Sequence, residues 1–310
     1  MMRTASRLIA LLTVCCLTLA GCSNADPLDT GNAGAAPGSS TVVRVGSASF
    51  PESEIIAELY AQTLEAKGIK VDRTMQIGAR DVYIAALRDG SIDLVPEYTG
   101  NLLQFFDAQT KAKTPEAVAA ELAYSTPSGM KVGRPAPAED KDAYNVTKQF
   151  SQQHNITSLD DLRTYSGTLR VGGNAEFAQR PYGPKGLTNV YGVPADRIQM
   201  IPIADSGGPL TVRALAQGEV DAADIYTTTP AIRDEGFVVL KDPKNMIMPQ
   251  NVVPLMSTRV DRQDVVDAVN AVSAKLTTDD LIAMNARNQG ADKASPRDIA
   301  SAWLKQKGLA

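Results

Sequence analysis

Histidine and cysteine are scarce in this chain of 310 residues, which has one histidine, His154, and three cysteines. Zinc sites built from clusters of these residues would lack ligands, and a Ser-His-Asp triad would have to use His154. Basic residues number 31 against 35 acidic ones, so the net charge of −4 leaves no basic footprint for nucleic acid. The sequence therefore predicts no metal, no cofactor, no nucleic-acid partner and no enzyme, and favours a binding protein.

No apolar run is long enough to anchor the chain in a membrane as a helix. Arg3 and Arg7 precede an apolar stretch at residues 8–20, which is shorter than the roughly 20 residues that a membrane span needs. A basic start followed by a short apolar run is typical of a secretory signal, so residues 1–21 are predicted to be a signal peptide. The run closes in Leu19-Ala20-Gly21-Cys22. This tetrapeptide resembles the lipobox of bacterial lipoproteins, which implies that Cys22 becomes the lipidated N-terminus; an ordinary export signal followed by a chance cysteine is the alternative.

Large apolar residues are nearly absent from the next segment, residues 22–41. It is rich in Gly, Ala, Ser, Thr, Asn, Asp and Pro, and Leu28 is its single large apolar side chain. Such a composition cannot bury enough surface to fold, so we predict a flexible tether. Cys15 and Cys16 would leave with the signal, and no disulfide is expected. The predicted location is extracytoplasmic, with a lipid anchor to the cell membrane.

The remaining sequence alternates between strand-like and helix-like patterns. A β-branched run at residues 42–45 precedes an apolar stripe at helical spacing over residues 55–64, and a second strand follows at residues 71–77. Ser49 and Glu52 are spaced as a capping box for the helix between these strands. Strands alternating with helices predict an α/β fold with largely parallel sheets.

An internal repeat is the most informative feature of the sequence. Residues 85–99 align without a gap on residues 213–227, and each copy reads as a helix, a glycine (Gly90 or Gly218), and a strand. Ligands of open α/β sheets bind at the carboxyl ends of strands, so two similar lobes would each present a tyrosine and a threonine to the space between them. The alternative is that both tyrosines are half-buried core aromatics. The residues at these strand ends are Tyr98 with Thr99, and Tyr226 with Thr227.

Two aspartates also recur at the same position of the repeat. Asp93 and Asp221 each follow the helix and its glycine. A short carboxylate at such a position commonly binds backbone N–H groups. We therefore expect a shared structural role for them, not acid–base chemistry.

Four segments together carry a resemblance to a known family. They are Gly46-Ser47-Ala48-Ser49-Phe50-Pro51-Glu52, Gly90-Ser91-Ile92-Asp93-Leu94-Val95-Pro96-Glu97-Tyr98-Thr99-Gly100, Gly186-Leu187 with Val190-Tyr191-Gly192, and Gly218-Glu219-Val220-Asp221 leading to Tyr226-Thr227-Thr228. With these segments, the chain resembles the extracytoplasmic solute-binding proteins of ABC importers for quaternary-ammonium osmoprotectants such as glycine betaine, choline and carnitine. This resemblance implies a two-lobed periplasmic-binding-protein fold of type II, with discontinuous lobes at 42–140 plus 251–310 and at 141–250, joined by a two-segment hinge.

The resemblance also implies a function. Members hold the trimethylammonium group of a solute in a cage of aromatic rings closed by both lobes, and deliver it to a membrane permease powered by a partner ATPase. A quaternary ammonium offers no N–H, and an aromatic face still attracts it. The cage residues implied here are Tyr98, Tyr144 and Tyr226, with Phe50 as a weaker member.

A zwitterionic solute also has a carboxylate, which the family meets with a positive side chain. Arg180 lies where relatives place an arginine, and Thr99 and Thr227 would add hydroxyl donors. Ala48 stands where relatives often have a lysine. The alternatives are a larger or non-betaine ligand on the same scaffold, or a sensor or receptor lipoprotein. A lipoprotein hydrolase is disfavoured because no nucleophile–base pair is found in the sequence.

Overall fold

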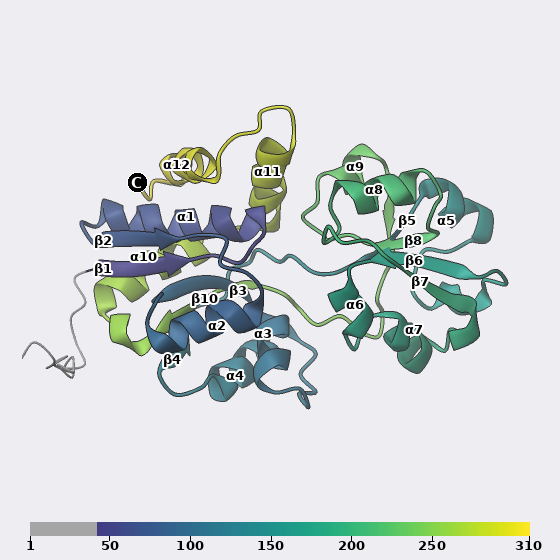
Figure 1. Cartoon of the computed structure of the whole chain (residues 1–310), viewed down its shortest axis with the longest axis horizontal. Coiled ribbons are helices and arrows are strands. Elements are labelled where there is room, and N and C mark those ends of the chain that lie inside the picture. The colour runs from purple at the N-terminus through teal and green to yellow at the C-terminus, as the bar shows by residue number, and fades with distance from the viewer. Residues whose placement is uncertain (1–41) are drawn as a thin grey trace, which may run out of the picture. The chain divides into compact units, whose positions relative to one another are not determined.

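The computed structural model describes residues 42–310, which belong to one compact unit (Figure 1). The predicted signal peptide, Cys22 and the predicted tether lie outside the described residues. Among residues 42–310, no helix combines the length and the apolar character needed to cross a bilayer.

The first of two five-stranded sheets has the strand order β2-β1-β3-β10-β4. β1 is parallel to β2 and β3, and β10 is antiparallel to both β3 and β4, so four strands run one way and β10 runs the other. The strands are β1 (Val42–Gly46), β2 (Lys70–Thr74), β3 (Leu94–Tyr98), β4 (Met130–Val132) and β10 (Val252–Ser257).

The second sheet repeats this plan with the order β7-β6-β8-β5-β9. β6 is parallel to β7 and β8, and β5 is antiparallel to β8 and β9. The predicted α/β fold with largely parallel sheets is confirmed, with one antiparallel strand in each sheet. The strands are β5 (Tyr144–Val146), β6 (Leu169–Gly173), β7 (Ile198–Pro202), β8 (Ala222–Asp224) and β9 (Val238–Val239).

Helices cover both faces of the first sheet (Figure 1). Along β10, Val252 and Met256 share one core with α1, α10, α11 and α12, while Val253 and Leu255 share another with α2, α3 and α4. This alternation is what a strand buried on both faces requires. The helices are α1 (Pro51–Ala66), α2 (Arg80–Asp89), α3 (Thr99–Phe106), α4 (Pro115–Ser125), α10 (Gln263–Ser273), α11 (Thr278–Gln289) and α12 (Pro296–Lys307), with the 3-10 helix η3 (Thr258–Val260).

The second sheet is also covered on both faces. Its larger core joins β5 and β6 to α6 and α7, and a smaller one joins Ala223 of β8 to Leu215 of α8. The helices are α5 (Lys148–His154), α6 (Ala175–Gln179), α7 (Pro184–Tyr191), α8 (Pro209–Ala216) and α9 (Ala231–Asp234), with the 3-10 helices η1 (Asp161–Thr164) and η2 (Ala195–Arg197).

The chain passes between the two sheets twice, and the two passages pair with each other. Glu139 and Asn251 form an antiparallel bridge, the Asp140 N–H donates to the Gln250 carbonyl at 3.2 Å, and the Val252 N–H donates to the Ala138 carbonyl at 3.0 Å. We call the elements around the first sheet lobe 1 and those around the second sheet lobe 2. The residue boundaries given above for the lobes stay a prediction.

The capping box predicted at Ser49 and Glu52 is wrong. The N-cap of α1 is Phe50, whose side chain makes no capping hydrogen bond. Ser53 Oγ accepts the Ala48 N–H at 3.0 Å, and Glu52 is held away from the helix terminus by Tyr98, whose hydroxyl donates to its Oε1 at 2.6 Å. Ser49 and Glu52 have the three-residue spacing of a capping box, but the Glu52 carboxylate accepts hydrogen bonds from residues distant in sequence and does not cap the helix.

The internal repeat corresponds to equivalent elements of the two lobes. Gly90 (φ 90°) follows α2, and Gly218 (φ 69°) follows α8, both in the left-handed region that favours glycine. Asp93 accepts the backbone N–H of Arg44 at 3.0 Å, and Asp221 accepts the backbone N–H of Arg170 at 2.8 Å. The structural role predicted for both aspartates is confirmed, although the backbone they bind belongs to the neighbouring strand.

Candidate functional site

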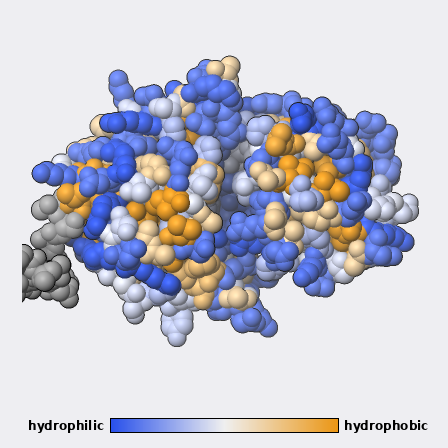
Figure 2. Space-filling view, viewed as in Figure 1, coloured by the Kyte–Doolittle hydropathy of each residue, from blue (hydrophilic) through white to orange (hydrophobic). Residues whose placement is uncertain are grey.

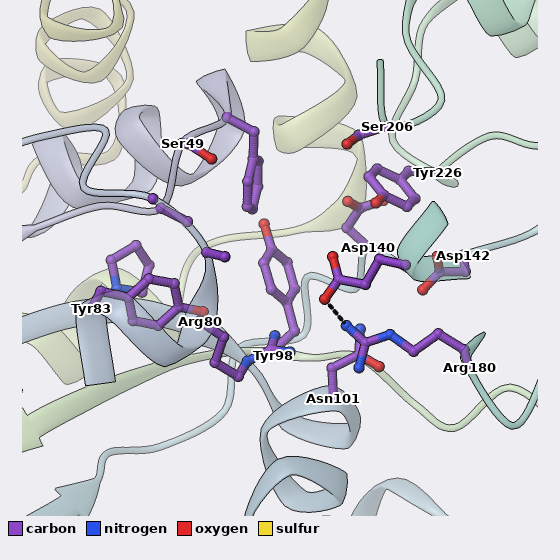
Figure 3. Close-up of a pocket in the computed structure, with 16 residues that line it drawn as sticks. Ser49, Arg80, Tyr83, Tyr98, Asn101, Asp140, Asp142, Arg180, Ser206 and Tyr226 are labelled. Carbon is purple, nitrogen blue, oxygen red and sulfur yellow. Dashed lines mark hydrogen bonds and ion pairs between the residues drawn. The ribbon is translucent and has the colours of Figure 1, made fainter. Parts of the chain in front are cut away.

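A cavity of about 200 Å³ opens between the lobes and takes its lining from both of them. On the face shown in Figure 2, the surface is hollowed between the two lobes. Figure 3 shows Tyr98 and Tyr226 on opposite sides of this cavity, with Arg180 extending toward its middle. Its aromatic and charged lining residues, with one amide, are Phe50, Arg80, Tyr83, Tyr98, Asn101, Asp140, Asp142, Glu176, Arg180 and Tyr226.

Tyr98 is the last residue of β3 and forms one aromatic wall. Its ring stacks on Phe50, with centroids 6.2 Å apart and planes 30° apart, and only 8% of the residue is exposed. Its hydroxyl donates to Glu52 Oε1 at 2.6 Å. Burial, followed by the neighbouring Glu52, raises the pKa of Tyr98, so the phenol stays neutral. The strand end and this hydrogen bond fix the ring at the cavity.

Tyr226 comes from the equivalent place in lobe 2, two residues beyond the end of β8. The turn beneath it requires Gly207, because a Cβ there would lie 3.0 Å from the Asp224 carbonyl oxygen, and φ is 75°. Burial and the nearby carboxyls, Asp142 first, raise the pKa of Tyr226. The repeat thus supplies one tyrosine to the cavity from each lobe.

The two arginines of the lining are each paired with a glutamate. Arg180 Nη2 lies 2.6 Å from Glu176 Oε1. Arg80 Nε lies 2.7 Å from Oε1 of Glu97, a buried residue that also accepts the Tyr83 hydroxyl at 2.6 Å. Their positive charges are therefore partly balanced by the protein itself.

The structure does not bring every predicted site residue to the cavity. Tyr144 is 1% exposed and donates its hydroxyl to the Tyr182 carbonyl at 2.9 Å, while its ring packs edge-on against Phe177. Thr99 donates to the Pro249 carbonyl at 3.2 Å, and Thr227 Oγ1 accepts the Lys141 N–H at 3.0 Å. These three side chains support the crossing segments and lobe 2 around the cavity, and none of them is part of its lining.

Two aspartates of the lining were missed by the sequence analysis. Asp142 Oδ2 accepts the Tyr182 hydroxyl at 2.7 Å, and Asp140 Oδ1 accepts the Thr228 N–H at 3.1 Å. Burial is the main cause that raises the pKa of both carboxyls, and Glu52 adds to the rise at Asp140. Their alternation, one residue apart in an extended segment at the predicted crossing, is the signal that would have found them.

Contacts between the lobes surround the cavity. Glu52 of α1 accepts hydrogen bonds through Oε2 from the Thr228 hydroxyl and from Asn285 Nδ2 of α11, both at 2.6 Å. On the other side, the Tyr182 hydroxyl lies 3.1 Å from Asn101 Oδ1. These hydrogen bonds connect the two lobes, so a movement of one lobe relative to the other would break or form them.

The chemistry of this site is that of recognition. Aromatic faces, carboxyls and guanidinium groups converge on a small space. Within residues 42–310, no group of three or more His, Cys, Asp or Glu side chains is arranged to hold a metal ion.

Comparisons with known proteins agree with this picture. Residues 41–306 match the family model described as the substrate binding domain of ABC-type glycine betaine transport systems. The glycine betaine-binding protein YehZ of Escherichia coli (strain K12) is 27% identical over 280 residues, which cover 86% of this chain and 90% of the relative.

Solved structures of this kind share the fold. A glycine betaine/carnitine/choline ABC transporter structure matches with a TM-score of 0.73 at 21% identity, covering 86% of this chain and 99% of its own. Lactococcal OpuAC, in its closed-liganded conformation with glycine betaine, matches with a TM-score of 0.60 at 17% identity, covering 86% and 97%. Because the family model spans most of the chain, this protein belongs to the substrate-binding domains of ABC-type glycine betaine transport systems, a family without enzymatic activity.

Proposed function

We propose that this protein captures a quaternary-ammonium solute of the glycine betaine and choline class between its lobes and delivers it to an ABC permease. The observation that carries the proposal is the placement of Tyr98 and Tyr226. These residues are equivalent in the repeat, belong to different lobes, and line one cavity together with Phe50. A ligand that touches both rings has to be held by both lobes at once.

The attraction between cation and ring supplies a suitable binding energy. Each desolvated aromatic face attracts a cation by about 0.5–2 kcal/mol. Three such faces supply a substantial share of the ~8 kcal/mol that a micromolar complex needs, and burial of the methyl groups adds to it. The E. coli relative is a glycine betaine-binding protein and the lactococcal structure is a complex with glycine betaine, which supports the same ligand class.

Arg180 is the group we propose for a ligand carboxylate. It lines the cavity and presents a planar guanidinium, although it already pairs with Glu176. Ala48 lies in the lining where the resemblance leads us to expect a lysine, so this chain has one fewer positive group there. A zwitterion would have to draw Arg180 away from Glu176 to be held at its carboxylate.

We further propose that a lipid on Cys22 keeps the protein at the outer side of the cell membrane. The tether over residues 22–41 would let the folded part reach its permease from that anchor. A partner ATPase would supply the energy for uptake.

Calorimetric titration of a form that starts after Cys22 tests the ligand class. Glycine betaine and choline are titrated separately in the same buffer, with tetramethylammonium as the smallest quaternary cation. We expect binding of at least one solute in the micromolar range. Absence of heat and of any melting-temperature shift with all three would contradict the ligand class and favour a larger or non-betaine ligand.

A further inference from the structure

Three aspartates gather where the first crossing segment meets the second sheet. Asp140 and Asp142 line the cavity and lie just before β5. Asp224 is the last residue of β8, which pairs with β5 so that Asp224 lies opposite Tyr144, and the Ile225 N–H donates to the Ala143 carbonyl at 3.1 Å. None of the ion pairs within residues 42–310 includes any of the three. Three carboxyls thus share one corner of the site without a paired cation.

Asp224 is the most unusual of these groups. It is completely buried, and neither carboxyl oxygen meets the geometry of a hydrogen bond from a donor among the described residues; the polar groups that act on it from close by are the carboxyl of Asp142 and the backbone N–H of Ala143. A buried charged carboxylate without a partner is strongly unfavourable, so the group takes up a proton instead. Burial and then the neighbouring carboxyl of Asp142 raise the pKa of Asp224.

Asp142 differs from Asp224 because it has donors. The Tyr182 hydroxyl donates to its Oδ2 at 2.7 Å, and the positive charge of Arg180 also favours its ionised form. A proton on Asp224 would give Asp142 one more donor. Burial raises the pKa of both carboxyls, but the Tyr182 hydroxyl and Arg180 oppose the rise at Asp142, so Asp224 holds the proton of the pair more firmly.

The other groups that face these carboxyls do not supply the missing positive charge. Nearly all of them are phenols or further acids, and Arg180, the one cation, is bonded to Glu176. The same holds for Arg80 on the far side of the cavity, which is bonded to Glu97. Asp140 is faced by Glu52, Thr228, Tyr98 and Asp142, and Asp142 is faced by Tyr182, Arg180 and Asp224. Asp224 is faced by Tyr144, Tyr226, Asp140 and Asp142.

We infer, on the basis of the proposed function, that Asp142 and Asp224 form a proton-sharing pair that provides the counter-charge for a net-cationic quaternary ammonium ligand, and that ligand binding releases the proton of Asp224. The ligand places a fixed positive charge in a cavity lined by Asp140 and Asp142. That charge stabilises the ionised carboxyls, and the proton leaves Asp224 for solvent or buffer. A zwitterion brings its own carboxylate into the same acidic corner, so the site favours choline over glycine betaine.

Proton release is measured by titrating choline calorimetrically in two buffers of equal pH and different ionisation enthalpy. Choline has no group that titrates near neutral pH, so any proton comes from the protein. We expect choline binding to release up to one proton per protein molecule. Because binding then competes with protonation, the affinity for choline should rise as the pH rises, by at most tenfold per pH unit when one full proton is released. Asp224→Asn supplies a permanent N–H donor to Asp142 and should release few protons, with an affinity that changes less than about twofold per pH unit. Asp196→Asn, an exposed change outside the lining, should behave as the wild type.

The outcomes separate this inference from the proposed function. If wild-type protein binds choline with a heat that is independent of the buffer, or binds glycine betaine as tightly as choline, the inference is overturned while the proposed function stands. If none of the quaternary ammonium solutes binds, the proposed function fails, and the pair is tested without ligand.

The ligand-free test is the pH dependence of unfolding. A carboxyl whose pKa is raised from 3.8 in the folded protein holds a proton that the unfolded chain has lost, so its contribution to stability is lost as the pH rises through the folded value. Wild-type protein should therefore lose stability relative to Asp224→Asn as the pH rises from the unfolded value of 3.8 toward neutral. A stability difference that is constant over this range would show that Asp224 holds no such proton.

Discussion

Among single residues, Tyr98 and Tyr226 give the clearest prediction, because their rings are proposed to contact the ligand. Replacing either by leucine removes the aromatic face and keeps an apolar side chain. If both rings face the cation, each substitution should weaken choline binding by about 0.5–2 kcal/mol, or roughly 2- to 30-fold. Calorimetric titration measures this loss.

Two controls accompany these variants. Tyr124→Leu changes a tyrosine that is 92% exposed and outside the lining, so its affinity should equal that of the wild type. Thermal melting checks that Tyr98→Leu still folds, because Tyr98 also belongs to the core of lobe 1. An unchanged affinity in a folded Tyr98→Leu or Tyr226→Leu protein would remove that residue from the site.

The site residues found from the sequence were those that a repeat or a family pattern marks. The repeat pointed to Tyr98 and Tyr226, and the resemblance pointed to Phe50 and Arg180; all four line the cavity. Asp140 and Asp142 alternate in an extended segment, but neither belongs to the repeat, and no sequence pattern shows that this segment borders the cavity. Asp224, the partner of Asp142, lies 82 positions further along the chain and becomes its neighbour only through the β5–β8 pairing.

Among the secondary-structure elements, the repeated aspartates Asp93 and Asp221 each link the start of one strand to the backbone of the neighbouring strand, β1 or β6. Asp93 is fully buried, accepts the Arg44 N–H and Nε at 3.0 and 2.9 Å, and is also approached by Arg259 at 3.4 Å. Asp221 has 11% of its side chain exposed and pairs with one arginine, Arg170, whereas Asp93 is contacted by two. The two copies perform one task with different degrees of burial.

We expect Asp93→Asn to destabilise the protein more than Asp221→Asn does. Hydrogen bonds to charged groups contribute about 1.5–3 kcal/mol each, and less where solvent screens them. The free energy of unfolding from urea titration should fall by about 2–3 kcal/mol for Asp93→Asn and by about 1–2 kcal/mol for Asp221→Asn. If the two substitutions lower the free energy of unfolding equally, or if Asp93→Asn does not lower it, this structural role of Asp93 is contradicted. Ligand affinity should stay near the wild-type value, since neither residue lines the cavity.

Elements with strong local signals were predictable, and elements defined by tertiary partners were less so. Ser295 followed by Pro296 is a local signal for the start of a helix, and α12 begins there, with Ser295 Oγ accepting the Asp298 N–H at 3.1 Å. Glu52 had the spacing of a capping residue, yet its carboxylate binds Tyr98, Thr228 and Asn285, which come from three other parts of the chain. The antiparallel direction of β10 could not be predicted from the sequence either, because the direction of a strand in a sheet depends on the path of the whole chain.

At the scale of the whole molecule, the predicted anchor decides where the protein works. Cys22→Ser removes the sulfur that a lipid would occupy, so the variant should move from the membrane pellet to the soluble fraction. Fractionation of cells followed by detection of the protein measures this. The ligand affinity of the released protein should match that of the wild type, because the substitution changes none of the residues that line the cavity. A variant that remains entirely in the pellet would argue against lipidation at Cys22.

Two similar lobes were predicted from the repeat, and one copy falls in each sheet. The pairing of the two crossing segments was not predicted, because Glu139 and Asn251 lie 112 positions apart and no local pattern links them. Their proximity also places Asp140 and Asp142 at the cavity. The charge of the site is therefore a property of the assembled molecule and is not visible in any single segment.

The central claim is that this cavity binds a fixed positive charge. The most direct measurement compares the affinity of choline with that of 3,3-dimethyl-1-butanol, in which carbon replaces the quaternary nitrogen at nearly the same shape. Aromatic faces and carboxyls both distinguish the two compounds, and burial of their methyl groups does not. We predict that choline binds and that the uncharged analogue binds at least tenfold more weakly. Equal affinities would contradict the account, because they would show that the site recognises the shape of the ligand and not its charge.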